Sequence, residues 1–219
     1  MKPTDVPGVF KKNERIFTKN PTDCKGTKVY SEHLITEEGT EYRSWNPFRS
    51  KLAAAILKGT QVPLTPQMHL LYLGAATGTT VSHLSDILTS GTIYAIENSP
   101  VAMTSLLNVS DRRPNIVPLL EDANHPERYR LFVPPVDVLY QDISQRNQAE
   151  IFTRNATQYL KKEGTGFLMV KARSIDVALK PKQAYDLVCS QLKTSGFRIL
   201  EMQELGPYEK DHAVLRVSW

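Results

Sequence analysis

Cysteine is scarce in this sequence, and long apolar runs are missing from it. Cys24 and Cys189 are the only two cysteines, lie far apart and belong to no paired motif. We therefore expect two structural thiols in an intracellular chain rather than a disulfide framework. No stretch approaches the ~20 apolar residues of a membrane-spanning helix, and the first residues lack the apolar centre of a secretory signal. These absences predict a cytoplasmic protein that does not contact a membrane.

Metal-ligand patterns are missing too. The histidines show no ligand spacing among themselves or with the cysteines, so no metal site is expected. They are His33, His69, His83, His125 and His212. The chain has 219 residues, of which 41% are hydrophobic and 23% charged. This length and composition suffice for one sizeable core, or for one core with a small appendage.

The excess of positive charge is confined to one end of the chain. The net charge is +4, and residues 1–30 alone hold seven Lys or Arg against three Asp or Glu. A polyanion bound at this end and a solvated basic face both explain that distribution. The candidate phosphate-binding residues are Lys11, Lys12, Arg15, Lys19, Lys25 and Lys28 at this end, and Arg112, Arg113, Arg146 and Arg173 nearer the predicted strand ends.

The first part of the chain has the pattern of a small β domain. Short β-prone segments are separated by turn-forming pairs, and a hairpin is predicted around a turn at 37–40. The segments are 9–10, 15–18 and 28–30, and the hairpin strands are 33–36 and 41–45. A helical pattern follows at 50–58 and ends at Gly59. We place the N-terminal β domain at residues 1–48.

From residue 68 onward strands and helices alternate, which predicts an α/β fold in a second domain, residues 49–219. The predicted strands are 68–73, 92–97, 115–118, 136–140 and 166–171, and the predicted helices are 79–88, 99–108, 145–161 and 181–195. Ser99 and Pro100 form a typical helix start. The last two strands, 197–205 and 212–219, follow each other without a helix between them. An α/β sheet that ends in an antiparallel hairpin is the architecture of Rossmann-like methyltransferases.

The most informative stretch is residues 70–80, where an apolar segment leads into Gly74 and Gly78. A strand that ends in such a turn lets the backbone approach a bulky ligand and directs free amides of the next helix at it. The next predicted strand ends in Glu97, a carboxylate that can accept both hydroxyls of an adenosine ribose. Together these features predict a nucleoside cofactor at the carboxyl edge of the sheet. An ordinary tight turn without a ligand is the alternative.

The glycine spacing indicates which nucleoside is bound. The dinucleotide fingerprint G-x-G-x-x-G needs glycine where this chain has Ala76 and Thr79, so a nicotinamide dehydrogenase is the least favoured interpretation. S-adenosylmethionine has no pyrophosphate and needs no third glycine. Asp122 and a neighbouring amide can read the amino group and ring nitrogen of its adenine. The expected cofactor-binding residues are Gly74, Ala75, Gly78, Thr79, Thr80, Glu97, Asp122, Ala123, Asp142 and Gln145.

Four segments of the chain resemble the fibrillarin family of box C/D RNA-guided ribose 2′-O-methyltransferases in its archaeal form. They are residues 42–54, 73–82, 140–142 and 207–213, and the similarity extends from about residue 9 to the last residue. The first and last segments are specific, whereas the glycine segment is generic. The resemblance implies a small N-terminal β domain on a Rossmann-like S-adenosylmethionine-dependent methyltransferase domain. It also implies S-adenosylhomocysteine as a product and the ribose 2′-hydroxyl of rRNA, or of tRNA, as the acceptor.

The same resemblance implies a catalytic set of Lys51, Asp142 and Lys171. His212 stands where many related ribose methyltransferases have a glutamate, so it either orients the target or merely packs. A ribose 2′-hydroxyl is a weak nucleophile, and a base works best with a pKa near the working pH, below the ~10.4 of free lysine. We therefore expect Lys171 to accept the proton, Lys51 to be its electrostatic partner, and Asp142 to orient Lys171 and the donor. Taken singly, each lysine has the alternative of being solvated, and Asp142 that of capping a helix.

Members of this family act inside a particle. The expected partners are a Nop-domain coiled-coil scaffold, a kink-turn-binding ribosomal-type protein, box C/D guide RNA and target RNA. Two other functions stay open, namely methylation of a small molecule or protein without guide RNA, and a subunit that binds cofactor without chemistry. Trp45 and Phe48 are expected in the core at the domain junction rather than in a base-stacking platform.

Overall fold

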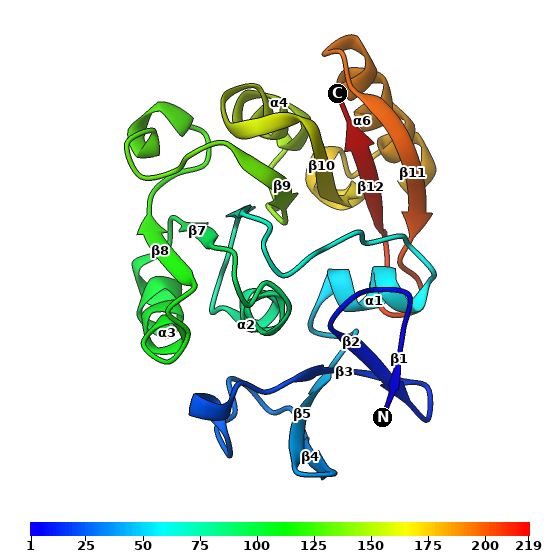
Figure 1. The fold of residues 1–219 in the computed structure, drawn as a ribbon. Helices are drawn as coiled ribbons and strands as arrows, with labels where there is room; N and C mark the ends of the chain where they lie inside the picture. The colour runs from blue at the N-terminus through cyan, green and yellow to red at the C-terminus, as the bar shows by residue number, and fades with distance from the viewer.

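The smaller of two β-sheets is built from residues 2–45 (Figure 1). The computed structural model describes all residues, 1–219. The strands lie in the order β1-β2-β3-β5-β4, and every neighbouring pair is antiparallel. Their bounds are β1 Lys2–Pro3, β2 Val9–Lys12, β3 Arg15–Lys19, β4 Leu34–Glu37 and β5 Thr40–Trp45. The predicted hairpin is confirmed as β4 and β5.

One predicted strand, residues 28–30, is wrong. The segment follows the short 3₁₀ helix η1 (Thr22–Cys24) and has no regular structure. The carboxylate of Glu32 accepts the backbone N–H of Val29 at 2.8 Å and that of Tyr30 at 2.7 Å. Because a side chain already uses these donors, the segment does not pair with a neighbouring strand.

The larger sheet has seven strands in the order β11-β12-β10-β9-β6-β7-β8. Their bounds are β6 Leu70–Leu73, β7 Ile93–Glu97, β8 Ile116–Leu120, β9 Val136–Gln141, β10 Leu160–Lys171, β11 Arg198–Glu204 and β12 His212–Ser218. The strands from β10 to β8 are parallel, whereas β12 is antiparallel to both β10 and β11. This topology confirms the predicted α/β sheet with a final antiparallel hairpin.

Six α-helices accompany the two sheets. Their bounds are α1 Lys51–Leu57, α2 Thr79–Ile87, α3 Pro100–Ser110, α4 Gln148–Tyr159, α5 Ala172–Ile175 and α6 Pro181–Thr194. The predicted start of α3 is confirmed, since the side chain of Ser99 accepts the N–H of Ala102 at 3.3 Å. The helix predicted at 145–161 is shorter because Leu160 already enters β10, whose polar first half carries little strand signal. The four-residue α5 and the 3₁₀ helix η2 (Pro126–Tyr129) are too short for periodicity to predict them.

Helices cover the larger sheet on both faces. Alternate residues of a strand point to opposite faces, and β6 shows this clearly. Leu70 and Tyr72 belong to the core shared with α1, α2 and α3, whereas Leu71 and Leu73 belong to the core shared with α4 and α6. The first of these cores also contains Val9, Ile16 and Trp45 of the smaller sheet. The smaller sheet and the first helix layer therefore share one continuous core, although the boundary between residues 48 and 49 stays a prediction.

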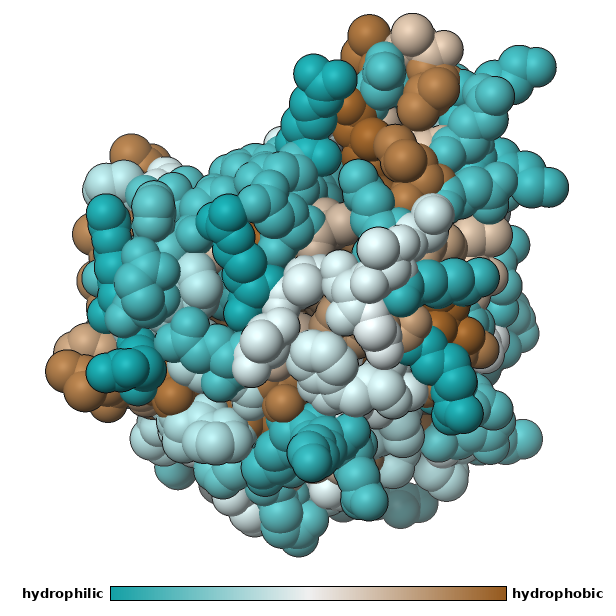
Figure 2. All heavy atoms as spheres, turned by 90° about the horizontal axis from the view of Figure 1, so that it is seen from above, coloured by the Kyte–Doolittle hydropathy of each residue, from teal (hydrophilic) through white to brown (hydrophobic).

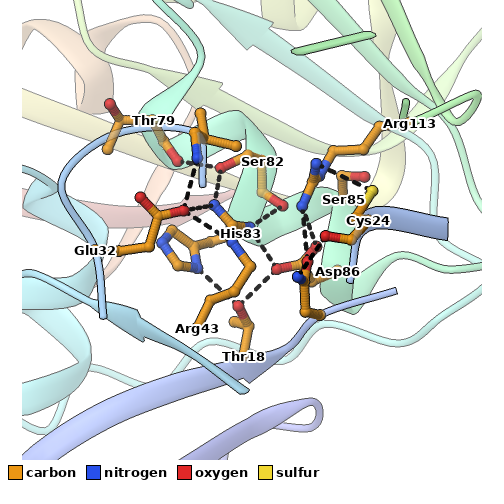
Figure 3. Close-up of polar contacts among 12 residues, drawn as sticks. Thr18, Cys24, Glu32, Arg43, Thr79, Ser82, His83, Ser85, Asp86 and Arg113 are labelled. Atoms are coloured by element: carbon orange, nitrogen blue, oxygen red, sulfur yellow. Dashed lines mark hydrogen bonds and ion pairs between the residues drawn. The ribbon is translucent and has the colours of Figure 1, made fainter. Parts of the chain in front are cut away.

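Charged side chains are buried where the smaller sheet meets α2 (Figure 3). The guanidinium of Arg43 is completely buried and lies 2.9 Å from a carboxylate oxygen of Glu32 and 2.7 Å from one of Asp86. It also donates to the side chain of Ser82 at 2.9 Å and to its carbonyl oxygen at 3.4 Å. This arrangement satisfies a buried charge from both sides of the junction.

Arg113 joins the same cluster, so its prediction as a phosphate-binding residue is wrong for this structure. Its side chain is 2% exposed and pairs with Asp86 at 3.1 Å. It also donates to the side chain of Asn20 at 3.3 Å and to Sγ of Cys24 at 3.4 Å. A guanidinium with these protein partners in the interior is not available to RNA.

His83 lies at the centre of the junction. It is fully buried, its ring stacks on Trp45 with centroids 4.8 Å apart, and its two nitrogens lie 2.7 Å from the hydroxyls of Thr18 and Tyr30. Burial, assisted by the nearby positive charges of Arg43 and Arg113, lowers its pKa well below the usual 6.5. The folded protein therefore keeps this histidine neutral.

Seen from above, most of the surface is polar, and apolar atoms form separate groups (Figure 2).

Trp45 is buried at the junction as expected, but the expectation for Phe48 is wrong because its side chain is 63% exposed. The turn between β5 and α1 carries this ring outward, where it meets Tyr208 edge-on at 5.3 Å. None of the helices is both long and apolar enough to cross a bilayer.

The neutral histidine gives the stability of the protein a specific pH dependence. Below about pH 6.5 the unfolded chain binds a proton at His83 and the folded protein does not, so stability is full above that pH and falls below it. We expect His83→Gln to be less stable at pH 7.5 but to lose less further stability on acidification to pH 5. Urea unfolding of both proteins across this range measures the difference. Equal slopes for the two proteins would contradict a neutral buried His83.

Candidate active site

The loop after β6 holds its shape through two glycines with left-handed backbone. Gly74 has φ +81° and Gly78, the N-cap of α2, has φ +87°. A Cβ atom on Gly74 would lie 2.4 Å from the backbone oxygen of Asp142. The N–H of Asp142 in turn donates to the carbonyl of Leu73 at 2.9 Å. The ends of β6 and β9 thus approach each other so closely that a residue with a Cβ atom does not fit at position 74 unless the backbone shifts.

Glu97, at the end of β7, is fixed by the same loop. One carboxylate oxygen accepts the N–H of Ala76 at 2.7 Å, and the other accepts that of Ser99 at 2.8 Å. A carboxylate has about four acceptor positions, so two remain after these bonds are made. Glu97 also lines the pocket described next, where those positions can accept hydroxyl donors.

A pocket of about 260 Å³ lies at the carboxyl edge of the larger sheet. Its walls come from the segments that follow β6, β7, β8 and β9. The predicted cofactor residues among its lining are Gly74, Glu97, Asp122, Ala123, Asp142 and Gln145. The lining residues that were not among the predicted cofactor residues are Ala76, Ile96, Asn98, Glu121, Ile143 and Ser144.

Four predicted cofactor residues do not line this pocket. They are Ala75, Gly78, Thr79 and Thr80. Gly78 and Thr79 form the start of α2, and the N–H of Gly78 already donates to the carbonyl oxygen of Ala75 at 3.1 Å. The side chain of Thr80 is buried and donates to the hydroxyl of Ser50. Cofactor contact by these four residues stays a prediction.

The corner of the pocket after β8 has an ordered hydrogen-bond pattern. Asn124 donates to a carboxylate oxygen of Asp122 from its backbone N–H and from its side-chain amide, both at 2.9 Å. The backbone hydrogen bond is the main reason that the pKa of Asp122 is lowered. Asn124 also donates to Gln145 at 3.1 Å, while the N–H of Ala123 has no acceptor within the protein. An ionised acceptor and a free donor therefore stand side by side.

Two residues of the predicted Lys-Asp-Lys set, Lys51 and Asp142, are in contact. The ammonium of Lys51, the first residue of α1, lies 2.9 Å and 3.0 Å from the two carboxylate oxygens of Asp142. Asp142 makes no ion pair with Lys171, and the expected orientation of Lys171 by Asp142 stays a prediction. Lys171, the last residue of β10, is half-buried and has no ion pair. The edge of the sheet thus carries one paired and one unpaired lysine.

His212 lies opposite Lys171 in the β10–β12 pairing. Its Nδ1–H donates to the carbonyl oxygen of Lys210 at 2.7 Å, so in the neutral imidazole Nε2 is the acceptor nitrogen. Neighbouring Arg173 pairs with Asp211 at 3.0 Å, so this predicted RNA-contact residue has a partner of its own. No group of three or more His, Cys, Asp or Glu is arranged to hold a metal ion.

Several of the predicted phosphate-binding residues make ion pairs or hydrogen bonds within the protein. Lys11 lies 3.1 Å from Glu14, Lys12 pairs with Glu37, and Arg112 donates to Thr27 at 3.0 Å. The remaining predicted phosphate-binding residues are exposed. They are Arg15, Lys19, Lys25, Lys28 and Arg146.

The sequence pattern of fibrillarin matches residues 2–219, which is almost the whole chain. The chain belongs to the fibrillarin family. It is 47% identical over 207 residues to the fibrillarin-like rRNA/tRNA 2′-O-methyltransferase of Methanosarcina barkeri, covering 93% of this chain and 91% of that protein.

Two fibrillarin structures are similar to this one. The fibrillarin of Aeropyrum pernix, solved with natively bound S-adenosyl-L-methionine, gives a TM-score of 0.84 at 44% identity, over 93% of this chain and 88% of that chain. A fibrillarin/Nop5p complex gives a TM-score of 0.89 at 41% identity, over 97% of this chain and 98% of that chain. The Rossmann-like methyltransferase fold with a small N-terminal sheet is thus the fibrillarin fold.

The close approach at Gly74 is open to a direct test. Gly74→Ala adds a clash with the Asp142 backbone to the strain of a positive φ, which alone costs about 1–2 kcal/mol. Gly39→Ala is the matched control, because Gly39 has φ +76° and nothing within 4 Å of an added Cβ. We expect Gly74→Ala to lose clearly more stability in urea unfolding than Gly39→Ala. Equal losses would contradict the tight contact between β6 and β9.

Proposed function

We propose that this fibrillarin-family protein transfers a methyl group from S-adenosylmethionine to the ribose 2′-hydroxyl of rRNA, and of tRNA, as the catalytic subunit of a guide-RNA-directed box C/D particle. The main support for this proposal is the group of charged residues Lys51, Asp142 and Lys171 at the carboxyl edge of the larger sheet. There Lys51 is held on both oxygens of Asp142, and Lys171 ends the neighbouring strand without a partner.

The pocket residues fit S-adenosylmethionine. Glu97 offers two free acceptor positions to the ribose hydroxyls, while Asp122 and the N–H of Ala123 offer an acceptor and a donor to the edge of adenine. The loop at Gly74 gives the rest of the ligand close access to the backbone. When bound, the cofactor supplies an electrophilic methyl group on a sulfonium. Natively bound S-adenosyl-L-methionine in the Aeropyrum pernix relative supports this assignment.

The two lysines have different environments and therefore different roles. The ammonium of Lys51 is held by both oxygens of Asp142, so it contacts that carboxylate rather than the attacking hydroxyl. Lys51 thus holds Asp142 in place and adds positive charge to the edge. We assign Lys171, in its unprotonated form, as the acceptor of the proton that the 2′-hydroxyl loses. His212, opposite Lys171 in the sheet, presents Nε2 as an acceptor that orients the target ribose.

Membership of the fibrillarin family also supports the proposed box C/D particle. A structural relative was solved as a fibrillarin/Nop5p complex, which supports a Nop-domain scaffold as partner. A kink-turn-binding protein, box C/D guide RNA and target RNA complete the proposed particle. The exposed basic residues described above are the candidates for RNA contact. Guide RNA selects the target, so the chain itself needs little sequence-specific binding.

The adenine corner gives a prediction about cofactor affinity. Asp122→Ala removes the ionised acceptor, and hydrogen bonds to charged groups contribute about 1.5–3 kcal/mol, so we expect affinity to fall roughly 10- to 100-fold. Isothermal calorimetry with S-adenosylmethionine measures it. The control is Glu127→Ala, an exposed acid in the following turn. Unchanged affinity in Asp122→Ala would move adenine out of this corner.

The role of Lys171 gives a prediction about turnover. We expect Lys171→Ala to reduce kcat by at least ~100-fold, as loss of a general base does, with cofactor affinity little changed. Lys171→Arg should not restore turnover, because a guanidinium does not release its proton. Lys162→Ala, at an exposed position earlier in β10, is the control. Near wild-type turnover of Lys171→Ala on a saturating target would exclude Lys171 as the base.

Reconstitution tests the whole proposal. The protein is combined with guide RNA, the Nop-domain scaffold and the kink-turn-binding protein, and transfer of labelled methyl to a matched target is measured. We expect transfer that disappears when the selected nucleotide carries 2′-deoxyribose, and poor transfer by the isolated protein. Transfer that survives the deoxy substitution would place the methyl on another atom. Fast transfer without guide RNA would contradict the assembly, and no transfer at all would favour a subunit without chemistry.

A further inference from the structure

Two buried hydroxyls connect the helix that carries Lys51 with the helix that follows the glycine loop. The side chain of Thr80, in the first turn of α2, donates to Oγ of Ser50 at 3.0 Å. Ser50 is the N-cap of α1 and is 2% exposed, and Thr80 is 7% exposed. A hydrogen bond shielded from water in this way holds its geometry better than one at the surface.

The Oγ atom of Ser50 makes a second hydrogen bond. It accepts the backbone N–H of Ala53 at 3.3 Å, which completes the cap of α1. Lys51 is the residue that follows Ser50, so the same oxygen determines where α1 begins and how its first turn lies against α2. The position of the Lys51 backbone therefore depends on the contact with Thr80.

These contacts close a ring around the edge of the pocket. Lys51 reaches Asp142, and Asp142 is bonded through its N–H to Leu73 and packed against the backbone of Gly74. From there the chain runs through the glycine loop to Thr80. The ring contains only two side-chain contacts, and the one between Lys51 and Asp142 is partly exposed. The ion pair orients the ammonium, whereas the hydroxyl contact positions the backbone from which Lys51 extends.

We propose that Ser50 and Thr80 are positioning residues that couple occupation of the glycine loop to the placement of Lys51. A ligand that binds the amides at the start of α2 restricts its first turn. Through the two hydroxyls, α1 and the ammonium of Lys51 are then restricted as well. The effect of this coupling on methyl transfer rests on the proposed function, whereas the coupling between the two helices does not.

Hydrogen exchange measures the coupling without any methyl transfer. S-adenosylhomocysteine is added to the whole protein, and amide protection is followed at 53–58, in α1 and its C-cap, and at 79–83 in α2. In the wild type we expect ligand to protect both segments. In Thr80→Val, which keeps the shape but removes the hydroxyl, we expect protection of 79–83 without that of 53–58. Thr80→Ser should behave as the wild type.

Two further variants keep this test decisive. Thr18→Val removes another buried threonine hydroxyl that contacts α2, through His83 and Asp86, and does not touch Ser50. It should lose stability but retain coupled protection. Ser50→Gly preserves a tolerated cap residue without the hydroxyl and should uncouple the helices if Thr80→Val does not fold. Protection of α1 that persists in Thr80→Val or Ser50→Gly, or is absent in the wild type, would overturn the proposal.

Turnover in the reconstituted particle separates positioning from binding. We expect Thr80→Val to lower kcat about tenfold or more, because small misplacements of reacting groups are costly, with KM values little changed and recovery in Thr80→Ser. If particles with wild-type protein are active and Thr80→Val has the same kcat, the contact between Thr80 and Ser50 does not affect turnover, and that part of the proposal is overturned. Particles that are inactive even with wild-type protein would instead refute the proposed function, while the exchange result stands by itself.

Discussion

The buried guanidinium of Arg43 is the interaction on which the rest of the structure depends. It lies between Glu32 of the N-terminal segment and Asp86 of α2, and its donors also reach Ser82. Removing one member of a buried pair costs about 3–5 kcal/mol, because the other charge is left without a partner. A slide of the smaller sheet over α2 would break these contacts together. The cluster therefore allows one arrangement of the two parts of the chain.

That arrangement matters because the chain leaves the smaller sheet at Trp45 and enters α1 at Lys51. The position of the sheet on α2 thus determines where Lys51 begins, and the Ser50–Thr80 contact refines it. On the other side, Asp142 is held by the close approach of its backbone to Gly74. Lys51 and Asp142 meet because both sides are anchored to α2 and to the loop that precedes it. The cofactor pocket and the charged edge are built from the same few backbone segments.

Sequence patterns predicted the larger sheet well because buried parallel strands and amphipathic helices have strong periodicity. The strand–glycine–helix sequence at 70–80 lies beside a pocket in the structure, where Gly74 and Ala76 form part of the lining. Local patterns failed where a distant side chain decides the outcome. Residues 28–30 lost their strand pairing to the carboxylate of Glu32, and Arg113 was drawn inside by Asp86. The pairing of Asp142 with Lys51 likewise depends on a contact between residues 91 positions apart.

Because the smaller sheet and the larger domain share one core and one buried ion cluster, we expect them to unfold as one cooperative unit. In a Trp219→Phe variant, Trp45 at the junction is the only tryptophan, so its fluorescence reports on the junction, while far-ultraviolet circular dichroism reports mainly on the larger domain. The decisive measurement is urea unfolding of this variant followed by both signals. We expect coincident transitions with one midpoint and one slope. A Trp45 transition at clearly lower urea, with the dichroism still native, would show that the buried cluster does not unite the two parts.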